Sequence, residues 1–173
     1  MDNTLAAPAR TQIVLDAIEH WHRHTPIRLK KRQSGDDSWV RFIDGGGCAS
    51  AVGRQGGEQH IILGAGCSVG NAIHEIGHAV GLWHEQSRID RDRFIEIVWS
   101  NIRPEARHNF SQHIEDAVVL GNYDLESIMH YGSRFFPIDP TQDTIKVKTP
   151  GTAIGQRQKL SAGDIAAVRE LYP

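Results

Sequence analysis

Cysteine is scarce in this chain, with two residues among 173. Small secreted domains that fold around a framework of disulfides carry many more, so that class of protein is excluded. A chain of this length buries roughly two-thirds of the surface that its unfolded form exposes, and it needs no such framework. With 39% apolar and 23% charged residues, the composition is that of a globular protein with one domain.

Neither sign of charge predominates, and no apolar run is long. The 19 Lys and Arg against 21 Asp and Glu give a net charge of −2, so we expect no strongly basic face and no nucleic-acid partner. The longest apolar stretches are too short to span a membrane. Residues 1–10 lack the charged-then-apolar layout of a signal peptide. We therefore expect no membrane partner.

The spacing of apolar residues predicts both helices and strands. Apolar residues at helical period indicate an amphipathic helix at residues 11–24 and a second helix at residues 69–82. A final helix is expected to begin at the capping box of residues 161–164. Strands are predicted at residues 27–32, 39–43, 60–63 and 94–99, and irregular chain with short helical pieces at residues 101–136.

Histidine, in contrast, is abundant, with ten residues. It is the commonest metal ligand, and an excess of it can reflect a purification tag, a surface bias or a site. A tag is excluded because the ten are dispersed along the chain. They lie at positions 20, 22, 24, 60, 74, 78, 84, 108, 113 and 130.

Three of these histidines share one motif. From His74 to His84 the chain reads H-E-I-G-H-A-V-G-L-W-H, which fits the pattern H-E-x-x-H-x-x-G-x-x-H. On a helix, His74 and His78 lie one turn apart on one face, so both can bind one ion. Glu75 is one step around the helix, where it can reach a water on that ion without ligating it.

Gly81 allows the third histidine to face the same ion. Glycine adopts positive φ freely, so it can end the helix and turn the chain back toward the metal. Three neutral imidazoles leave one coordination position open, which is the catalytic arrangement of zinc. The alternative is a helix that carries three histidines by coincidence, but the five fixed positions would arise by chance in roughly two of ten thousand such sequences.

Other motifs accompany this one. Glu85 directly follows the third histidine, Ser127–Tyr131 reads S-I-M-H-Y, and the chain closes with I-G-Q-R at 154–157 and L-S-A-G-D-I at 160–165. With these motifs the chain resembles the astacins, zinc endopeptidases of the metzincin clan, from the first helix to Tyr172. Glu85 and the Ser-x-Met-x-Tyr turn favour astacins over the matrixin, adamalysin and serralysin relatives.

The resemblance implies an α+β fold of the metzincin (zincin-like) type, in a single peptidase domain spanning residues 1–173. An N-terminal subdomain, about residues 1–83, would hold a twisted mixed sheet, the active-site helix and a second helix. A C-terminal subdomain, about residues 84–173, would be irregular and end in a helix.

The resemblance also implies a zinc-dependent endopeptidase that hydrolyses internal bonds of proteins or peptides. The ligands of one catalytic Zn²⁺ would be His74, His78 and His84. Glu75 would be the general base that later gives the proton to the leaving amine. Tyr131 would ligate zinc at rest and hydrogen-bond the oxyanion during the reaction, although from the residue alone a buried core tyrosine is equally plausible. Met129 would form a packed apolar floor below the histidines.

Substrate contacts are expected at two places. The strand made of His60, Ile61, Ile62 and Leu63 precedes the active-site helix, where metzincins carry an edge strand that can pair with an extended peptide. An ordinary sheet strand explains the same pattern. Arg134 resembles a position from which some astacins favour acidic residues after the cleaved bond, and a solvated surface arginine is the alternative.

Cys48 and Cys67 match the positions of an astacin disulfide, whereas two free thiols in a reducing compartment are the alternative. The family usually has a second bridge, from the segment after the first helix to the C-terminus. We expect a member with one bridge, because Pro26 stands at the first of these positions and the sequence runs to Pro173 without a cysteine at the second. The family also begins with a strand whose buried N-terminus approaches the glutamate that matches Glu85. This chain starts almost at its first helix, so the structural role of Glu85 is left open.

Two other functions compete with the peptidase. A zinc-bound interaction domain without catalysis would be expected to lack Glu75 or Tyr131, and both are present. Another metzincin peptidase would not be expected to carry Glu85. His20 and His24 also have i, i+4 spacing, but no third ligand accompanies them, so we interpret them as a solvated pair. We expect a secreted monomer that acts on protein or peptide substrates.

Overall fold

Residues 8–115 and 117–173 are described by a computed structural model of the chain. Residues 1–7, which make up most of the segment tested for a signal-peptide layout, lie outside the described residues. The chain forms two compact units. Unit 1 comprises the residues up to Leu82 with Arg157–Leu160 and Val168–Pro173, and unit 2 comprises Trp83–Gln156 and Ser161–Ala167.

Two packed helices form one half of unit 1. Helix α1 (Pro8–His24) buries Val14, Ala17 and Trp21 completely, at the helical spacing predicted from the sequence. The indole N–H of Trp21 donates a hydrogen bond of 3.0 Å to the carbonyl of Ile73 on the second helix. This bond and the apolar stripe fix α1 against its neighbour.

The second helix, α2 (Val69–Ala79), follows the N-cap residue Ser68 and is buried over most of its length. Ser68 caps it in a reciprocal pair with Asn71, so two backbone N–H groups that have no partner inside the helix are satisfied. The first turn lies against the chain at Arg157, where a Cβ on Gly70 would meet the Arg157 carbonyl oxygen at 1.7 Å. Glycine is therefore required at this close approach.

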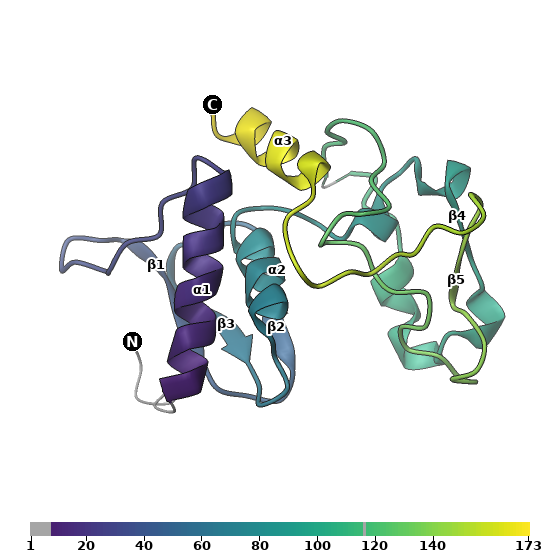
Figure 1. Ribbon diagram of the computed structural model, residues 1–173, viewed down its shortest axis with the longest axis horizontal. Helices are drawn as coiled ribbons and strands as arrows, with labels where there is room; N and C mark the ends of the chain where they lie inside the picture. Colours follow the sequence, from purple (N-terminus) through teal and green to yellow (C-terminus); the bar gives the residue numbers. More distant parts are fainter. Residues whose placement is uncertain (1–7, 116) are drawn as a thin grey trace. The chain divides into compact units, whose positions relative to one another are not determined.

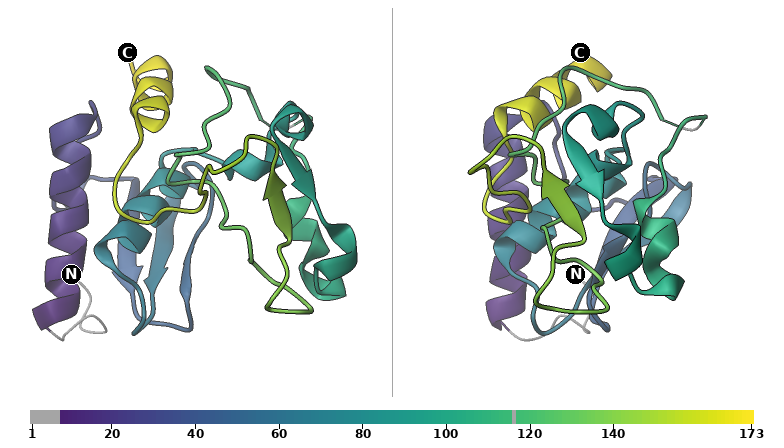
Figure 2. Two further views of the ribbon diagram at one scale, coloured as in Figure 1. Left: turned by 45° about the vertical axis from the view of Figure 1, so that its right-hand side comes forward. Right: turned by 90° about the vertical axis from the view of Figure 1, so that its right-hand side faces the viewer.

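The sheet of unit 1 has three strands in the order β1-β3-β2. They are β1 (Ser38–Ile43), β2 (Cys48–Ser50) and β3 (Gly57–Leu63). Strand β3 pairs parallel with β1 and antiparallel with β2, so the sheet is mixed, as expected. Helix α2 contacts α1 on one side and strands β2 and β3 on the other, and both views in Figure 2 show α1 on the far side of α2 from the strands (Figures 1 and 2).

Residues 27–32 are not a strand, and that prediction is wrong. Local side chains satisfy the backbone there instead of a neighbouring strand. The N–H of Leu29 donates to Nε2 of His22 at 2.9 Å, and the guanidinium of Arg28 donates to the carbonyl oxygens of Thr25 and Ile27. The alternation of apolar and basic residues resembled a strand, but no ladder forms.

The prediction that residues 60–63 form an edge strand is also wrong. They belong to β3, which lies in the centre of the sheet. Ile61 and Ile62 pair with Phe42 and Ile43 of β1, and on the other side with Ser50 and Ala49 of β2. Because Ile61 and Ile62 are paired on both sides, an extended peptide cannot add along them.

Unit 2 has little regular structure, as predicted for residues 101–136. A two-stranded antiparallel sheet joins β4 (Ile95–Ile97) to β5 (Ile145–Val147), and 3₁₀ turns include Trp99–Asn101 and Pro104–Phe110. The core is a cluster of aromatic and branched side chains. It is built from Ile95, Ile97, Ile102, Ala106, Phe110, Tyr123, Tyr131 and Ile145.

The last helix, α3 (Ala162–Leu171), begins at the predicted capping box. The N–H of Asp164 donates to Oγ of Ser161 at 2.9 Å, and the N–H of Ser161 donates to Oδ2 of Asp164 at 2.8 Å. Helix α3, together with the helices and the mixed sheet of unit 1, confirms the predicted α+β class. None of the helices in the described part of the chain has the length and apolarity to cross a membrane.

The two cysteines form the predicted disulfide. Cys48 and Cys67 are bonded, with their Cα atoms 6.0 Å apart and a sequence separation of 19. The bridge ties strand β2 to the turn that precedes α2. It therefore anchors the start of the helix that carries two of the motif histidines.

Removing this bridge is expected to lower the free energy of unfolding by about 3 kcal/mol, because a loop of this length then gains freedom in the unfolded chain. Urea unfolding of the Cys48→Ala, Cys67→Ala double variant measures the loss. A reductant should produce the same loss in the unaltered protein and none in the variant. A loss below about 1 kcal/mol would show that the bridge adds little beyond the packing of β2.

Candidate active site

Helix α2 presents the first two motif histidines on one face. His74 and His78 are both buried, and their ring centroids lie 4.6 Å apart with the planes almost perpendicular. This is the arrangement expected for residues four apart on a helix. Both imidazoles are therefore held side by side by the helix backbone itself.

Past the helix, the chain reverses at Gly81. The helix ends at Ala79, and Gly81 has a φ of +108°, a conformation that residues with a Cβ rarely adopt. The N–H of Leu82 then donates to the carbonyl of Gly77 at 2.9 Å, which closes the turn. His84 follows in extended conformation, two residues after the turn.

The third histidine completes a metal-binding geometry. One ring nitrogen from each of His74, His78 and His84 lies within 4.8 Å of the other two, and among the described residues this is the one such group of three or more His, Cys, Asp or Glu. The distance suits three ligands around a single ion. Imidazole nitrogen is a preferred ligand of Zn²⁺.

Hydrogen bonding and burial prepare His78 for this role. Its Nδ1 lies 2.8 Å from the carbonyl oxygen of Leu82, and because a carbonyl only accepts, Nδ1 carries the proton and Nε2 keeps a lone pair. Burial lowers the pKa of His78 to about 4, so the ring is neutral at physiological pH. Neutral imidazole is the form that binds metal.

Glu75 provides a buried carboxylate next to the first histidine. Its Oε2 has no hydrogen-bond partner among the described residues, although the side chain is only 4% exposed. Burial raises the pKa of Glu75 to about 7, while the charge of Arg157 acts in the opposite direction. A buried carboxylate oxygen without a donor is costly, and a water or substrate group would satisfy it. The residues thus fit a zinc centre with a proton acceptor beside it.

Tyr131 and Met129 lie on the turn that the sequence singled out. The ring of Tyr131 is buried with its centroid 4.5 Å from that of His84, and its N–H donates to Oε1 of Gln86 at 3.1 Å. Met129 is buried, and its carbonyl accepts the N–H of Glu85 at 3.2 Å. One backbone bond and one bond to a side chain therefore hold this turn against the residues that directly follow the third histidine.

Asp164 anchors the same turn, a contact that sequence analysis missed. Its carboxylate accepts hydrogen bonds from the hydroxyl of Ser127 at 2.6 Å and from the N–H of Ile128 at 2.9 Å. The Ser127 hydroxyl in turn accepts the N–H of Met129 at 2.9 Å. Asp164 was identified only as part of the capping box. Its second contact, about forty residues away in sequence, leaves no local pattern.

Glu85 has a defined environment in unit 2. Its Oε1 accepts the N–H of Asp124 at 2.7 Å, and the guanidinium of Arg88 lies 3.5 Å away. Burial raises the pKa of Glu85 to about 7. Glu85, the residue after the third histidine, is thus hydrogen-bonded to the segment that precedes the Met129 turn.

The other predicted site residues are held by local partners. His60 contacts the carboxylate of Glu58 at 2.9 Å, and Arg134 is paired with Asp143 at 3.0 Å. The rings of His20 and His24 lie 4.5 Å apart between centroids at an interplanar angle of 45°, and Nε2 of His20 accepts the N–H of Leu160 at 3.2 Å. A ring nitrogen used in this way does not face a metal.

Comparison with known proteins agrees with this geometry. The family model described as Astacin, a family of peptidases, matches residues 1–173. Zinc metalloproteinase nas-36 of Brugia malayi is 42% identical over 164 residues, which cover 92% of this chain and 28% of that protein. Bone morphogenetic protein 1 of Xenopus laevis is 40% identical over 171 residues, covering 92% and 24%. The chain spans about a quarter of the length of these curated relatives.

A solved structure gives the same result for the fold. High choriolytic enzyme 1, a hatching enzyme zinc-protease from Oryzias latipes, superposes with a TM-score of 0.90 at 34% sequence identity. The alignment covers 96% of this chain and 84% of that one. The metzincin-type fold predicted from the sequence is thereby confirmed.

Proposed function

This chain belongs to the astacin family of peptidases, and on that basis we propose that it is a zinc-dependent endopeptidase acting on proteins or peptides. The observation that carries the proposal is the group of His74, His78 and His84, one ring nitrogen of each lying within 4.8 Å of the other two. Glu75 lies on the same helix with one carboxylate oxygen that lacks a donor in the described chain. A metal-bound interaction domain would not need that carboxylate.

The three histidines would hold one catalytic Zn²⁺. When bound, zinc supplies Lewis-acid chemistry, which brings the pKa of water toward roughly 7 and polarises the scissile carbonyl. His78 keeps Nε2 available because its Nδ1 proton is engaged by Leu82. With three protein ligands, one position stays open for substrate.

Glu75 would take the proton of the attacking water and later deliver it to the leaving amine. A general base works best when its pKa lies near the pH of the reaction, and burial raises the pKa of this carboxyl to about 7. Glu75 directly follows His74 on α2. No other group is needed to carry the proton from one step to the next.

Tyr131 would donate a hydrogen bond from its hydroxyl to the oxyanion that forms at the scissile carbonyl. Its backbone is held by Gln86 and its ring packs beside His84. Met129 would support the turn from below as a buried apolar side chain. These two residues act through position, and neither transfers a proton.

The substrate would bind as an extended strand along β2. This strand is an outer strand of the sheet and contacts α2, whereas β3 is paired on both sides. Main-chain hydrogen bonds at such an edge recognise an internal stretch of chain rather than an end. A preference of Arg134 for acidic residues after the cleaved bond would require its guanidinium to leave Asp143.

The disulfide supports an extracellular location, because such bonds persist in oxidising compartments. Extracellular proteins and peptides would then be the substrates. The monomeric state expected from the sequence stays a prediction.

Fragment mapping tests the endopeptidase assignment. The protein is incubated with casein and with peptides blocked at both ends, and the products are identified by mass spectrometry. Internal fragments of both substrates are expected, because binding along a sheet edge does not read a terminus. Release of single terminal residues would contradict an endopeptidase, and intact substrates would favour the non-catalytic zinc domain.

A further inference from the structure

Positive charge is concentrated in one short segment of unit 1. Residues 20–32 contain five Lys and Arg and no Asp or Glu, which leaves 14 Lys and Arg against 21 Asp and Glu in the rest of the chain. The net charge of −2 is therefore the sum of +5 on this segment and −7 on the rest of the chain. The basic cluster, as we define it, comprises these five residues and Arg169: Arg23, Arg28, Lys30, Lys31, Arg32 and Arg169.

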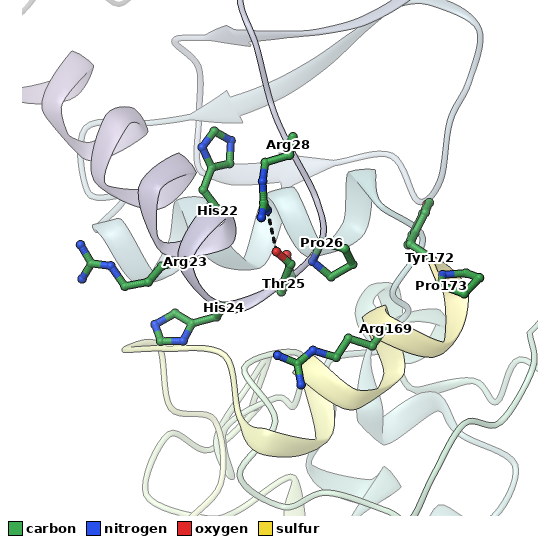
Figure 3. A pocket seen from close by; sticks show the side chains of 9 residues that line it. All are labelled: His22, Arg23, His24, Thr25, Pro26, Arg28, Arg169, Tyr172 and Pro173. Carbon is green, nitrogen blue, oxygen red and sulfur yellow. Dashed lines mark hydrogen bonds between the residues drawn. The ribbon is translucent and has the colours of Figure 1, made fainter.

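Three of these cations line one hollow. A cavity of about 510 Å³ lies where the end of α1 and the end of α3 meet, and Arg23, Arg28 and Arg169 line it. Figure 3 shows the three arginines arriving from different parts of the chain, with the Arg28 guanidinium directed at the carbonyl of Thr25. None of the residues lining the hollow is Asp or Glu.

Most of the cluster lacks an acidic partner. Among residues 8–115 and 117–173, Arg23 pairs with Glu19, and the other five cations form no ion pair. Arg28 uses one nitrogen for the carbonyl oxygens of Thr25 and Ile27, and Arg32 lies 3.2 Å above the ring of Trp39. The cluster thus contains five cations that no carboxylate of the described residues neutralises in an ion pair.

Nearby carboxylates are occupied elsewhere. Asp36 accepts the N–H of Gln33, and Asp37 pairs with Arg54 at 2.7 Å. The helix dipole explains cations near the ends of α1 and α3, where they stabilise the last turn. It does not explain the run at residues 30–32, which lies in no helix and is exposed.

We propose that the basic cluster binds a linear sulfated polysaccharide. Sulfate groups keep their charge at all physiological pH values and repeat along the polymer, so several can meet cations that are spread along an exposed segment. Arginine forms paired hydrogen bonds with such oxyanions. The hollow between Arg28 and Arg169 would receive one sulfate, and residues 30–32 would contact the next ones.

A nucleic acid fits this surface less well. Proteins that bind single strands stack bases on exposed aromatic rings. Here the ring of Trp39 is covered by Arg32, which leaves Tyr172 as the one Phe, Tyr or Trp residue that lines the hollow. The cluster thus offers six cations but few rings on which successive bases could stack, and the proposal does not depend on the proposed peptidase activity.

The test uses a triple variant, Lys30→Gln, Lys31→Gln and Arg169→Gln, none of which forms an ion pair or a side-chain hydrogen bond in the described chain. Binding to heparin is measured by titration calorimetry at about 50 mM salt and again at higher salt. The affinity of the variant is expected to fall by about 10- to 100-fold, and that of the unaltered protein to weaken steeply with salt.

A matched variant distinguishes the effect of where the cations lie from the effect of the total charge on heparin binding. Arg93→Gln, Arg107→Gln and Lys146→Gln remove the same charge from exposed positions in unit 2, and heparin affinity should change by less than about threefold. Equal losses in both variants would overturn the proposal, as would no heparin binding by the unaltered protein. Equally tight binding of desulfated heparin, polyglutamate or single-stranded DNA would also overturn it, because sulfate would then not be the group recognised.

Discussion

Replacing Glu75 with glutamine is expected to lower kcat/KM for a peptide substrate by about 1000-fold while zinc stays bound. A general base contributes on the order of 100- to 10,000-fold to such reactions. Glutamine has the same shape but cannot take a proton at neutral pH, so the loss falls on the chemical step. The histidines keep their positions, because Glu75 is not one of the three clustered ligands.

Three measurements make this result specific. Metal analysis should give the same zinc content for the variant as for the unaltered protein, and unfolding curves should show that it is folded. Glu126→Gln changes an exposed carboxylate in unit 2 and should leave kcat/KM within about twofold. Activity retained by Glu75→Gln would show that Glu75 does not carry the proton.

The second large effect is expected from His84→Ala, which removes the ligand that follows the turn at Gly81. Mutation of a group that only orients a metal ligand lowers metal affinity by about 10- to 100-fold. Loss of a ligand itself should therefore weaken zinc binding by more than about 100-fold. Cleavage should disappear at zinc concentrations that saturate the unaltered protein. Competition with a chromogenic chelator measures the affinity.

The matched control for this variant is His108→Ala, an exposed histidine outside the cluster. Its zinc affinity should be unchanged. His84 is only partly buried, so its alanine variant is expected to fold. If His84→Ala bound zinc as tightly as His108→Ala, the three-histidine site would be excluded.

Much of this geometry follows from local sequence. The spacing of His74 and His78 places both on one helical face, and Gly81 has the positive φ that the reversal requires. The capping box at Ser161 and Asp164 is equally local, and its hydrogen bonds form as predicted. In each case the partners are within five residues, so local backbone geometry decides the contact.

Contacts between distant segments were not predictable in this way. The central place of β3 depends on pairing with both β1 and β2, which an apolar run cannot reveal. Asp164 reaches Ser127 across 37 residues. The basic cluster was not predicted for another reason: the net charge of −2 is a sum over the whole chain and does not show where the charges lie. Local charge density, rather than the total, was the informative quantity.

Zinc removal and return tests the central assignment most directly. The purified protein is analysed for metal, treated with a zinc chelator, assayed on a quenched peptide, and assayed again after zinc is restored. We expect one zinc per chain, loss of cleavage when it is removed, and recovery when it is returned. Cleavage that persists in the metal-free protein, or zinc binding without any cleavage, would contradict a zinc endopeptidase.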